Sequence, residues 1–350
     1  MNLWQDKIRS IEPYVPGEQP TGNVIKLNTN ECPYAPSPKI KEVLDNYSID
    51  KLRLYPSFVC PQLKEALAKK YNVNENQIFL GNGSDEVLAL SFLAFFNSKK
   101  PVLFPDITYS FYDVWCKLYN IDFEKIPLND KFEINVNDYF KENGGIIIAN
   151  PNAPTGIYME LDALEEIIKH NQDVIIIIDE AYIDFGGKSA IELINKYDNI
   201  VIVQTFSKSR ALAGIRIGYV LTNPKLVDVL EAVKNSFNSY TLNSLSQVIG
   251  TVAVNDDQYL KDCCNKIIST RQRLVNALDQ LGFETLPSMA NFIFTKHKSI
   301  NGSDIFKYLK KNNIYIRYFN KPRISDYLRI TIGTDEQVDM LIEALTKYVK

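Results

Sequence analysis

The chain has 350 residues, of which 45% are hydrophobic and 23% are charged, and its formal net charge is −3. This is ordinary globular composition, with enough chain for one large core or two domains. No block of Lys and Arg and no apolar run of membrane-spanning length stands out, so we expect no nucleic-acid partner, no membrane partner and a cytoplasmic location.

The predicted elements begin after an N-terminal segment, residues 1–40, that is rich in proline and turn residues. We expect it to run along the surface and to join a smaller C-terminal unit. Short apolar runs follow at residues 101–104, 145–150, 174–179, 199–205 and 218–222. Amphipathic helical patterns lie between several of these runs, and the Ile and Val runs are uninterrupted. This alternation predicts an α/β fold with a mostly parallel sheet that has helices on both faces.

The C-terminal part shows a different pattern. It reads as a long amphipathic helix at 256–281, a strand at 291–296, a helix at 303–312, strands at 314–319 and 327–334, and a last helix with Thr334 as its N-cap. We therefore predict a large domain over residues 41–255 and a small α+β domain over residues 256–350, to which residues 1–40 are added.

Polar side chains follow four of the predicted strands. Tyr109 follows the first of them, Asn152 the second, Asp179 and Tyr182 the third, and Lys208 with its neighbour Ser207 the fourth. Ligands gather at the carboxyl ends of strands in open α/β sheets. Taken singly, a lysine is usually solvated, an aspartate at a strand end is usually a cap, and a tyrosine usually packs. The combination and its order indicate a binding site.

The segment GNGSDE at residues 81–86 follows a short apolar stretch and opens a predicted helix, which is an arrangement that binds phosphate through free backbone N–H groups. An ordinary glycine turn with Ser84 as N-cap is the alternative. Arg216 could add a bidentate phosphate contact, and on its own it would be a surface arginine.

Histidine and cysteine usage narrows the chemistry. The chain has only two histidines, so a Ser-His-Asp triad or a histidine-based metal site has little to draw on, and we expect no metal. Its five cysteines form no CxxC pair and are typical of reduced thiols in the cytosol. Acid–base chemistry at neutral pH therefore requires a lysine, a tyrosine or a cofactor. A phosphorylated aldehyde cofactor would use all the groups named above.

Several segments together resemble the fold-type I aminotransferases that depend on pyridoxal 5′-phosphate, and within them the histidinol-phosphate branch. They are LNTNECPYAPSP (27–38), LYPS (54–57), GNGSDE, DITYSFY (106–112), NPNAPTG, DEAYIDF (179–185), TFSKSRALAGIRIGY (205–219) and LRITIGT (328–334). The opening NEC-PYAP stretch, with PYVPG at residues 13–17, favours the histidinol-phosphate branch.

The resemblance implies roles for residues around the cofactor. Lys208 would form the imine and Asp179 would pair with the pyridinium nitrogen. Asn152 and Tyr182 would bond the ring oxygen, and Tyr109 would stack on the ring. The cofactor phosphate would be bound by Ser84, Asp85, Ser207 and Arg216.

The resemblance also implies a homodimer with shared active sites, because Tyr55 is expected to reach the cofactor phosphate of the neighbouring subunit. Arg317 and Arg329, with Tyr14 and Asn30, would bind the substrate. The implied reaction is a two-step transamination in which Lys208 moves the Cα proton. It would convert L-histidinol phosphate and 2-oxoglutarate to imidazole acetol phosphate and L-glutamate.

Three residues depart from the family pattern: Cys32, Ser209 and Arg210. They leave fine substrate preference open. A threonine-phosphate decarboxylase, which resembles this branch closely, and a broader aromatic or branched-chain aminotransferase are the alternatives on the same scaffold. A non-catalytic regulatory protein is the alternative from another class, and it would carry an added DNA-binding domain.

Overall fold

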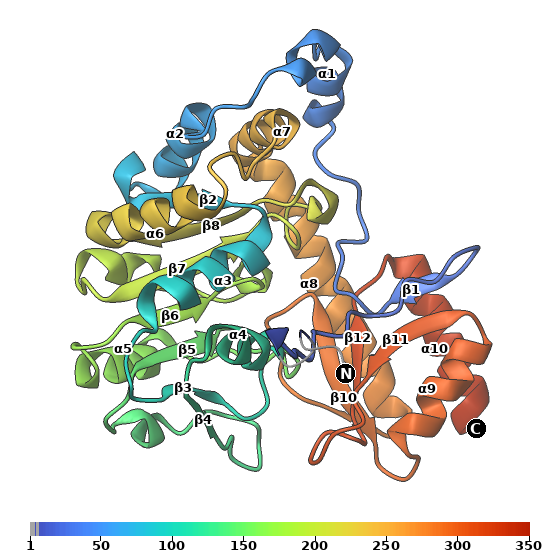
Figure 1. Cartoon of the computed structure of the whole chain (residues 1–350). Helices are drawn as coiled ribbons and strands as arrows, with labels where there is room; N and C mark the ends of the chain where they lie inside the picture. Colours follow the sequence, from blue (N-terminus) through green and yellow to red (C-terminus); the bar gives the residue numbers. More distant parts are fainter. Residues whose placement is uncertain (1–3, 5–6) are drawn as a thin grey trace.

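The structure is a computed structural model that describes residue 4 and residues 7–350. It contains a seven-stranded sheet and a five-stranded sheet. Figure 1 shows the larger sheet on the left and the smaller one on the right, with the long helix α8 (Asp257–Gln280) running between them. Among the described residues, no helix is both long enough and apolar enough to cross a membrane.

The larger sheet has the strand order β2-β8-β7-β6-β5-β3-β4. Its strands are β2 (Ile78–Gly81), β3 (Val102–Pro105), β4 (Phe123–Ile126), β5 (Gly145–Ala149), β6 (Ile176–Asp179), β7 (Ile200–Thr205) and β8 (Gly218–Thr222). β8 runs antiparallel to both of its neighbours, and the pairs among β3 to β7 are parallel. The prediction of a mostly parallel sheet is confirmed.

Helices cover both faces of this sheet. One face packs against α3 (Gly83–Phe95), α4 (Phe111–Tyr119) and α6 (Pro224–Phe237), and the other against α2 (Pro61–Tyr71), α5 (Leu161–His170) and α7 (Ser244–Asn255). The period of two in a strand explains the division, because Ile146 and Ile148 enter one core while Ile147 enters the other. Continuous isoleucine runs are therefore buried on both sides.

The smaller sheet has the order β1-β11-β12-β10-β9. Its strands are β1 (Ile25–Leu27), β9 (Phe283–Thr285), β10 (Phe292–His297), β11 (Ile314–Tyr318) and β12 (Leu328–Thr331), and α8, α9 (Gly302–Lys311) and α10 (Asp335–Val349) contribute to its core. The hydroxyl of Thr334 accepts a hydrogen bond from the backbone N–H of Gln337, which confirms the predicted cap. β1 pairs in parallel with β11, so the N-terminal segment joins this unit. The domain boundaries at residues 40 and 255 stay predictions.

The remaining helical segments are short. Helix α1 (Lys39–Asp45) lies at the top of Figure 1, away from both sheets. The 3-10 helices span Ile49–Arg53, Glu75–Gln77, Val136–Tyr139, Ile183–Phe185, Ala190–Asn195 and Ala213–Ile215.

Candidate active site

A cavity of about 230 Å³ lies where β5, β6 and β7 end and where the N-terminal segment and the smaller sheet meet the larger one. Its lining includes most of the residues predicted from the sequence: Tyr14, Asn30, Ser84, Asp85, Tyr109, Asp179, Tyr182, Ser207, Lys208, Arg216, Arg317 and Arg329. Segments more than 300 residues apart in the chain therefore contribute to one cavity.

Lys208 enters this cavity from the loop that follows β7. Its side-chain nitrogen, Nζ, lies 5.7 Å from the centre of the Tyr182 ring and 3.5 Å from the carbonyl oxygen of Thr29. The start of the loop is fixed by Thr205, whose hydroxyl accepts the backbone N–H of Ser207 at 3.1 Å. Lys208 is therefore a partly buried lysine on an ordered turn rather than a solvated one.

Two of the family departures anchor the same loop. Ser209 donates its hydroxyl proton to the carboxylate of Asp184. The guanidinium of Arg210 is buried, donates to the carbonyl oxygen of Ala253 at 2.6 Å and stacks over Phe206 at 5.1 Å. Neither residue lines the cavity, so their effect on the site passes through the position of Lys208.

Asp179 is the last residue of β6 and is 5% exposed. The hydroxyl of Tyr112 donates to its Oδ2 at 2.8 Å, and the backbone N–H of Ala181 donates to its Oδ1 at 3.2 Å. Burial dominates and raises the pKa of Asp179 to about 6, although both hydrogen bonds act in the opposite direction. Sequence reasoning missed Tyr112; the only signal for it was its place three residues after Tyr109 in the DITYSFY segment.

A cradle for an anion forms where α3 begins. Gly83 has φ +80°, and a Cβ there would lie 2.3 Å from Nη2 of Arg216. Gly218 is equally confined, because its Cβ would lie 2.4 Å from the backbone nitrogen of Ser84. α3 begins at Gly83, so Ser84 lies in the first turn of the helix rather than at its cap. The start of the helix and the guanidinium therefore approach closely only because two glycines stand there.

Asp85 links this cradle to the aromatic wall of the cavity. Its Oδ2 pairs with Nη2 of Arg216 at 3.1 Å, and its Oδ1 accepts the hydroxyl of Tyr109 at 2.9 Å. Nη1 of Arg216 also donates to Oγ of Ser207 at 3.4 Å. Tyr14, from the N-terminal segment, stacks on Phe111 with ring centres 4.2 Å apart and closes this side of the cavity.

A second cationic region lies on the other side of the cavity. Arg317 and Arg329 stand directly opposite each other on β11 and β12, and both guanidinium groups lie near the ring of Phe319, at 5.3 and 5.6 Å. Nη2 of Arg329 donates to the carbonyl oxygen of Asn28 at 2.9 Å, while its buried Nε has no hydrogen-bond partner in the described part of the chain. Burial lowers the pKa of Arg329. An anion would satisfy both arginines bidentately.

Two predicted residues lie outside the cavity lining. The amide of Asn152 is bonded to its own loop and to the loop after β3: Nδ2 donates to Oγ1 of Thr155 at 3.1 Å and to the carbonyl oxygen of Ile107 at 2.9 Å, and Oδ1 accepts the hydroxyl of Thr108 at 2.8 Å. Its neighbour Ala153 lines the cavity instead.

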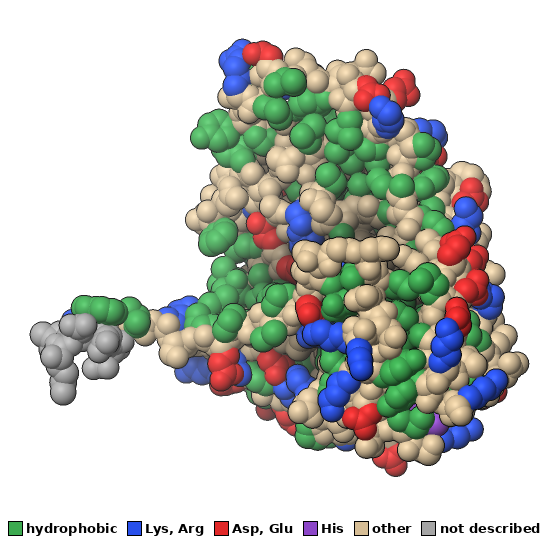
Figure 2. All heavy atoms as spheres, turned by 90° about the vertical axis from the view of Figure 1, so that its right-hand side faces the viewer, with side chains coloured by type: hydrophobic (Ala, Val, Ile, Leu, Met, Phe, Trp, Pro, Cys, Tyr) green, Lys and Arg blue, Asp and Glu red, His purple; other side chains and the backbone are tan. Residues whose placement is uncertain are grey.

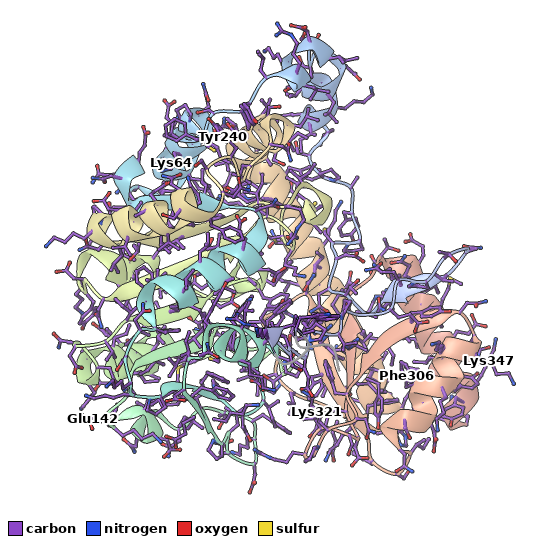
Figure 3. All side chains as sticks on the ribbon, viewed as in Figure 1. Lys64, Glu142, Tyr240, Phe306, Lys321 and Lys347 are labelled. Atoms are coloured by element: carbon purple, nitrogen blue, oxygen red, sulfur yellow. The ribbon has the colours of Figure 1, made fainter. Side chains whose placement is uncertain are left out.

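Tyr55 is the second of these residues. It is 82% exposed and stacks on Tyr240 with ring centres 4.7 Å apart. Figure 3 labels Tyr240 at the upper end of the molecule, far from Phe306 in the smaller unit.

The N-terminal segment supplies a carboxylate that sequence reasoning passed over. Glu31 lines the cavity, and its side chain accepts hydrogen bonds from Nζ of Lys26 at 2.7 Å and from the hydroxyl of Thr29 at 2.8 Å. Burial works against its ionisation, but these hydrogen bonds prevail and lower its pKa. Glu31 lies within the NEC-PYAP stretch, and the feature of the sequence that could have pointed to it is its carboxylate side chain.

Comparisons with known proteins show the family and the fold. The sequence model of the family Aminotransferase class I and II matches residues 22–345. A histidinol-phosphate aminotransferase of Lactococcus lactis subsp. cremoris (strain MG1363) is 51% identical over 348 residues, which cover 99% of this chain and 98% of that protein.

Solved structures share the fold. The histidinol-phosphate aminotransferase of Sinorhizobium meliloti in complex with pyridoxal-5′-phosphate has a TM-score of 0.85 at 23% identity and covers 93% of this chain and 90% of its own. The L-threonine-O-3-phosphate decarboxylase of Porphyromonas gingivalis has a TM-score of 0.80 at 22% identity and covers 93% of this chain and 99% of its own. At these identities the likeness concerns the fold alone.

Proposed function

Because the chain belongs to the class I and II aminotransferase family, we propose that it transfers the amino group of L-histidinol phosphate to 2-oxoglutarate with pyridoxal 5′-phosphate as cofactor. One observation carries the proposal: Lys208 and Asp179 share a cavity with two separate anion-binding regions, one at Arg216 and one at Arg317 and Arg329. One region suits the cofactor phosphate and the other suits the anionic end of each substrate.

The residues present fit this cofactor. The absence of a Cβ at Gly83 lets the guanidinium of Arg216 lie against the start of α3, beside Ser207, where it could bind a phosphate together with the backbone N–H groups of the helix. Asp179 is a carboxyl group whose burial raises its pKa, and a protonated ring nitrogen beside it would favour the ionised form. Tyr109 would cover a face of the ring.

When bound, pyridoxal 5′-phosphate supplies an electron-accepting ring that stabilises negative charge at the substrate Cα. Asp179 would keep the ring nitrogen protonated. Lys208 would hold the cofactor, and its free Nζ would take the proton from Cα. Its place beside the carbonyl oxygen of Thr29 keeps that nitrogen on the cavity side of the loop.

Arg317 and Arg329 bind the phosphate of the amino donor and, in the second half of the reaction, a carboxylate of the oxo acid. A guanidinium pairs bidentately with either anion, so one pair of arginines serves both substrates. Tyr14 and Phe319 line the same region and offer aromatic surface to an imidazole ring.

The active enzyme in this proposal is a homodimer with shared sites. An exposed apolar surface supports this, and we call it the arm surface: Leu44, Ile49, Leu52, Leu54, Tyr55, Phe58, Val59, Phe237, Tyr240 and Val248. Figure 2 shows hydrophobic side chains over the upper part of the molecule, where α1 and α7 lie in Figure 1. Large exposed apolar patches mark interaction surfaces.

Within this surface the loop that follows Tyr55 is held in place. The amide of Gln247 donates to the carbonyl oxygen of Ser57 at 2.8 Å, and Nζ of Lys234 donates to that of Phe58 at 3.4 Å. A second copy of the chain would cover the arm surface and would receive the Tyr55 hydroxyl at its cofactor phosphate.

A turnover panel tests the proposal. Purified protein loaded with pyridoxal 5′-phosphate should form glutamate from L-histidinol phosphate and 2-oxoglutarate, and should do so much faster than from phenylalanine. Release of CO2 from threonine phosphate without an oxo acid would instead establish the decarboxylase, and faster turnover of phenylalanine would establish a broader aminotransferase. A colourless protein that binds no cofactor would refute the enzyme altogether.

A further inference from the structure

Asn30 forms a buried polar junction between the N-terminal segment, the smaller sheet and Tyr182. It is 1% exposed and has a left-handed backbone with φ 57°. Its backbone N–H donates to Oγ1 of Thr331 at 3.0 Å, and that hydroxyl donates to Oδ1 of Asn30 at 3.0 Å. Its carbonyl oxygen accepts Nδ2 of Asn291 at 2.9 Å. These bonds fix which end of the Asn30 amide faces the cavity.

The end that faces the cavity is the NH₂ group. Nδ2 of Asn30 donates to the hydroxyl oxygen of Tyr182 at 2.9 Å. The amide oxygen is already engaged with Thr331, so the opposite orientation of the amide would break that bond. Tyr182 therefore acts as the acceptor in this pair, and its own hydroxyl proton stays available.

That proton has no acceptor elsewhere in the described part of the chain, and Tyr182 lines the cavity beside Lys208. The Tyr182 ring is held by an edge contact with Phe292, whose centre lies 5.0 Å away. Asn152, the other predicted partner of the cofactor ring oxygen, has both its amide oxygen and its amide nitrogen hydrogen-bonded to the loop after β3. Tyr182 is thus the member of that pair whose donor remains free.

We propose that Asn30 is a positioning residue that makes the Tyr182 hydroxyl a hydrogen-bond donor to the cofactor ring oxygen. The proposal rests on the proposed cofactor and goes beyond the predicted role of Asn30 in substrate binding. Asn30 acts only through Tyr182: it occupies a lone pair of the hydroxyl oxygen and so aims the proton into the cavity. A hydrogen bond donated to the ring oxygen draws electron density away from the imine nitrogen. It therefore lowers the pKa of the imine proton.

The absorbance of the bound cofactor as a function of pH measures this effect without turnover. Tyr182→Phe should raise the titration midpoint by about one unit, the size expected for one hydrogen bond to a charged or polarised group. Asn30→Gly, which tolerates the left-handed backbone, should raise it by roughly half a unit. The double variant should titrate as Tyr182→Phe does, because the amide has no route to the ring other than the hydroxyl.

A second substitution at the same position keeps the proposal testable if Asn30→Gly does not fold. Asn30→Asp keeps the shape, the backbone preference and the Thr331 bond, but its carboxylate must accept the Tyr182 proton. Asn30→Asp should therefore raise the titration midpoint more when Tyr182 is present than when it is replaced by phenylalanine. In the Tyr182→Phe protein only the direct effect of the new negative charge remains. Asn28→Ala is the matched control, since Asn28 also lines the cavity but bonds to Glu18, and its midpoint should match that of the native protein.

Midpoints for Asn30→Gly and Asn30→Asp equal to that of the native protein would overturn the proposal, as would additive shifts in the double variant. A native protein that binds no cofactor and shows no absorbance titration would instead overturn the proposed function, so the two failures are distinguishable.

Discussion

Asp179→Asn should stabilise the cofactor-free protein while it abolishes transamination. The pKa of Asp179 is about 6 in the folded protein, above the ordinary value of 3.8, because the carboxyl group is buried. The folded state therefore binds this proton more tightly than the unfolded state, and the stability it confers is lost as pH rises from about 4 to about 6. A shift of about two units corresponds to about 3 kcal/mol at neutral pH.

Asparagine can keep the local hydrogen bonds. Its Oδ1 can accept the backbone N–H of Ala181, and its Nδ2 can donate to the Tyr112 hydroxyl, which would turn from donor to acceptor. The substitution therefore removes the buried charge, and the Tyr112 hydroxyl proton, which loses its acceptor at every pH, does not alter the pH dependence. The neighbouring Glu180, whose burial raises its pKa to about 7, is present in both proteins and cancels from the comparison.

Urea unfolding of the two cofactor-free proteins measures the effect. The free energy of unfolding of Asp179→Asn should exceed that of the native protein, and the difference should grow by about 1.4 kcal/mol between about pH 5 and about pH 8. With pyridoxal 5′-phosphate present the order should reverse, because only the native carboxylate pairs with the ring nitrogen. A difference that does not change with pH would refute the reasoning about Asp179.

Three further outcomes follow from the geometry. Gly83→Ala should weaken binding of pyridoxal 5′-phosphate by about tenfold or more in an absorbance titration, because its Cβ would meet Arg216 and the backbone has φ +80°. Arg329→Lys should raise KM for L-histidinol phosphate about tenfold with a smaller effect on kcat, because a bidentate contact is lost; initial rates over a range of donor concentrations check this. Tyr55→Phe and Lys208→Ala proteins, once mixed and re-equilibrated, should regain more activity than the sum of the two, and failure to do so would contradict shared sites.

The sequence was sufficient for the larger sheet. Runs such as residues 145–150 and 174–179 consist of branched apolar residues that fit only strands buried on both sides, and they became β5 and β6. Tyr109, Asp179 and Lys208 each lie at or after the end of a predicted strand. Because parallel strands end on the same side of a sheet, the sequence placed all three at one edge of that sheet. Local patterns therefore encoded the part of the site that sits on strand ends.

The rest depends on contacts between distant segments. β1 has three residues and pairs with β11, almost the whole chain length away, so no local period could reveal it. Asn152 follows a strand as expected, yet the conformation of its loop directs its amide to Thr108 and Thr155. The bond from Asn30 to Tyr182 joins two residues of unremarkable type, and only their packing in three dimensions brings them together.

The most direct test of the account concerns Lys208. Reduction of the protein loaded with pyridoxal 5′-phosphate by sodium borohydride, followed by proteolysis and mass spectrometry, identifies the lysine that holds the cofactor. The account predicts the reduced cofactor on the peptide that contains Lys208, and none on that peptide in Lys208→Ala. Attachment to another lysine, or no attachment in a protein that transaminates L-histidinol phosphate, would contradict it.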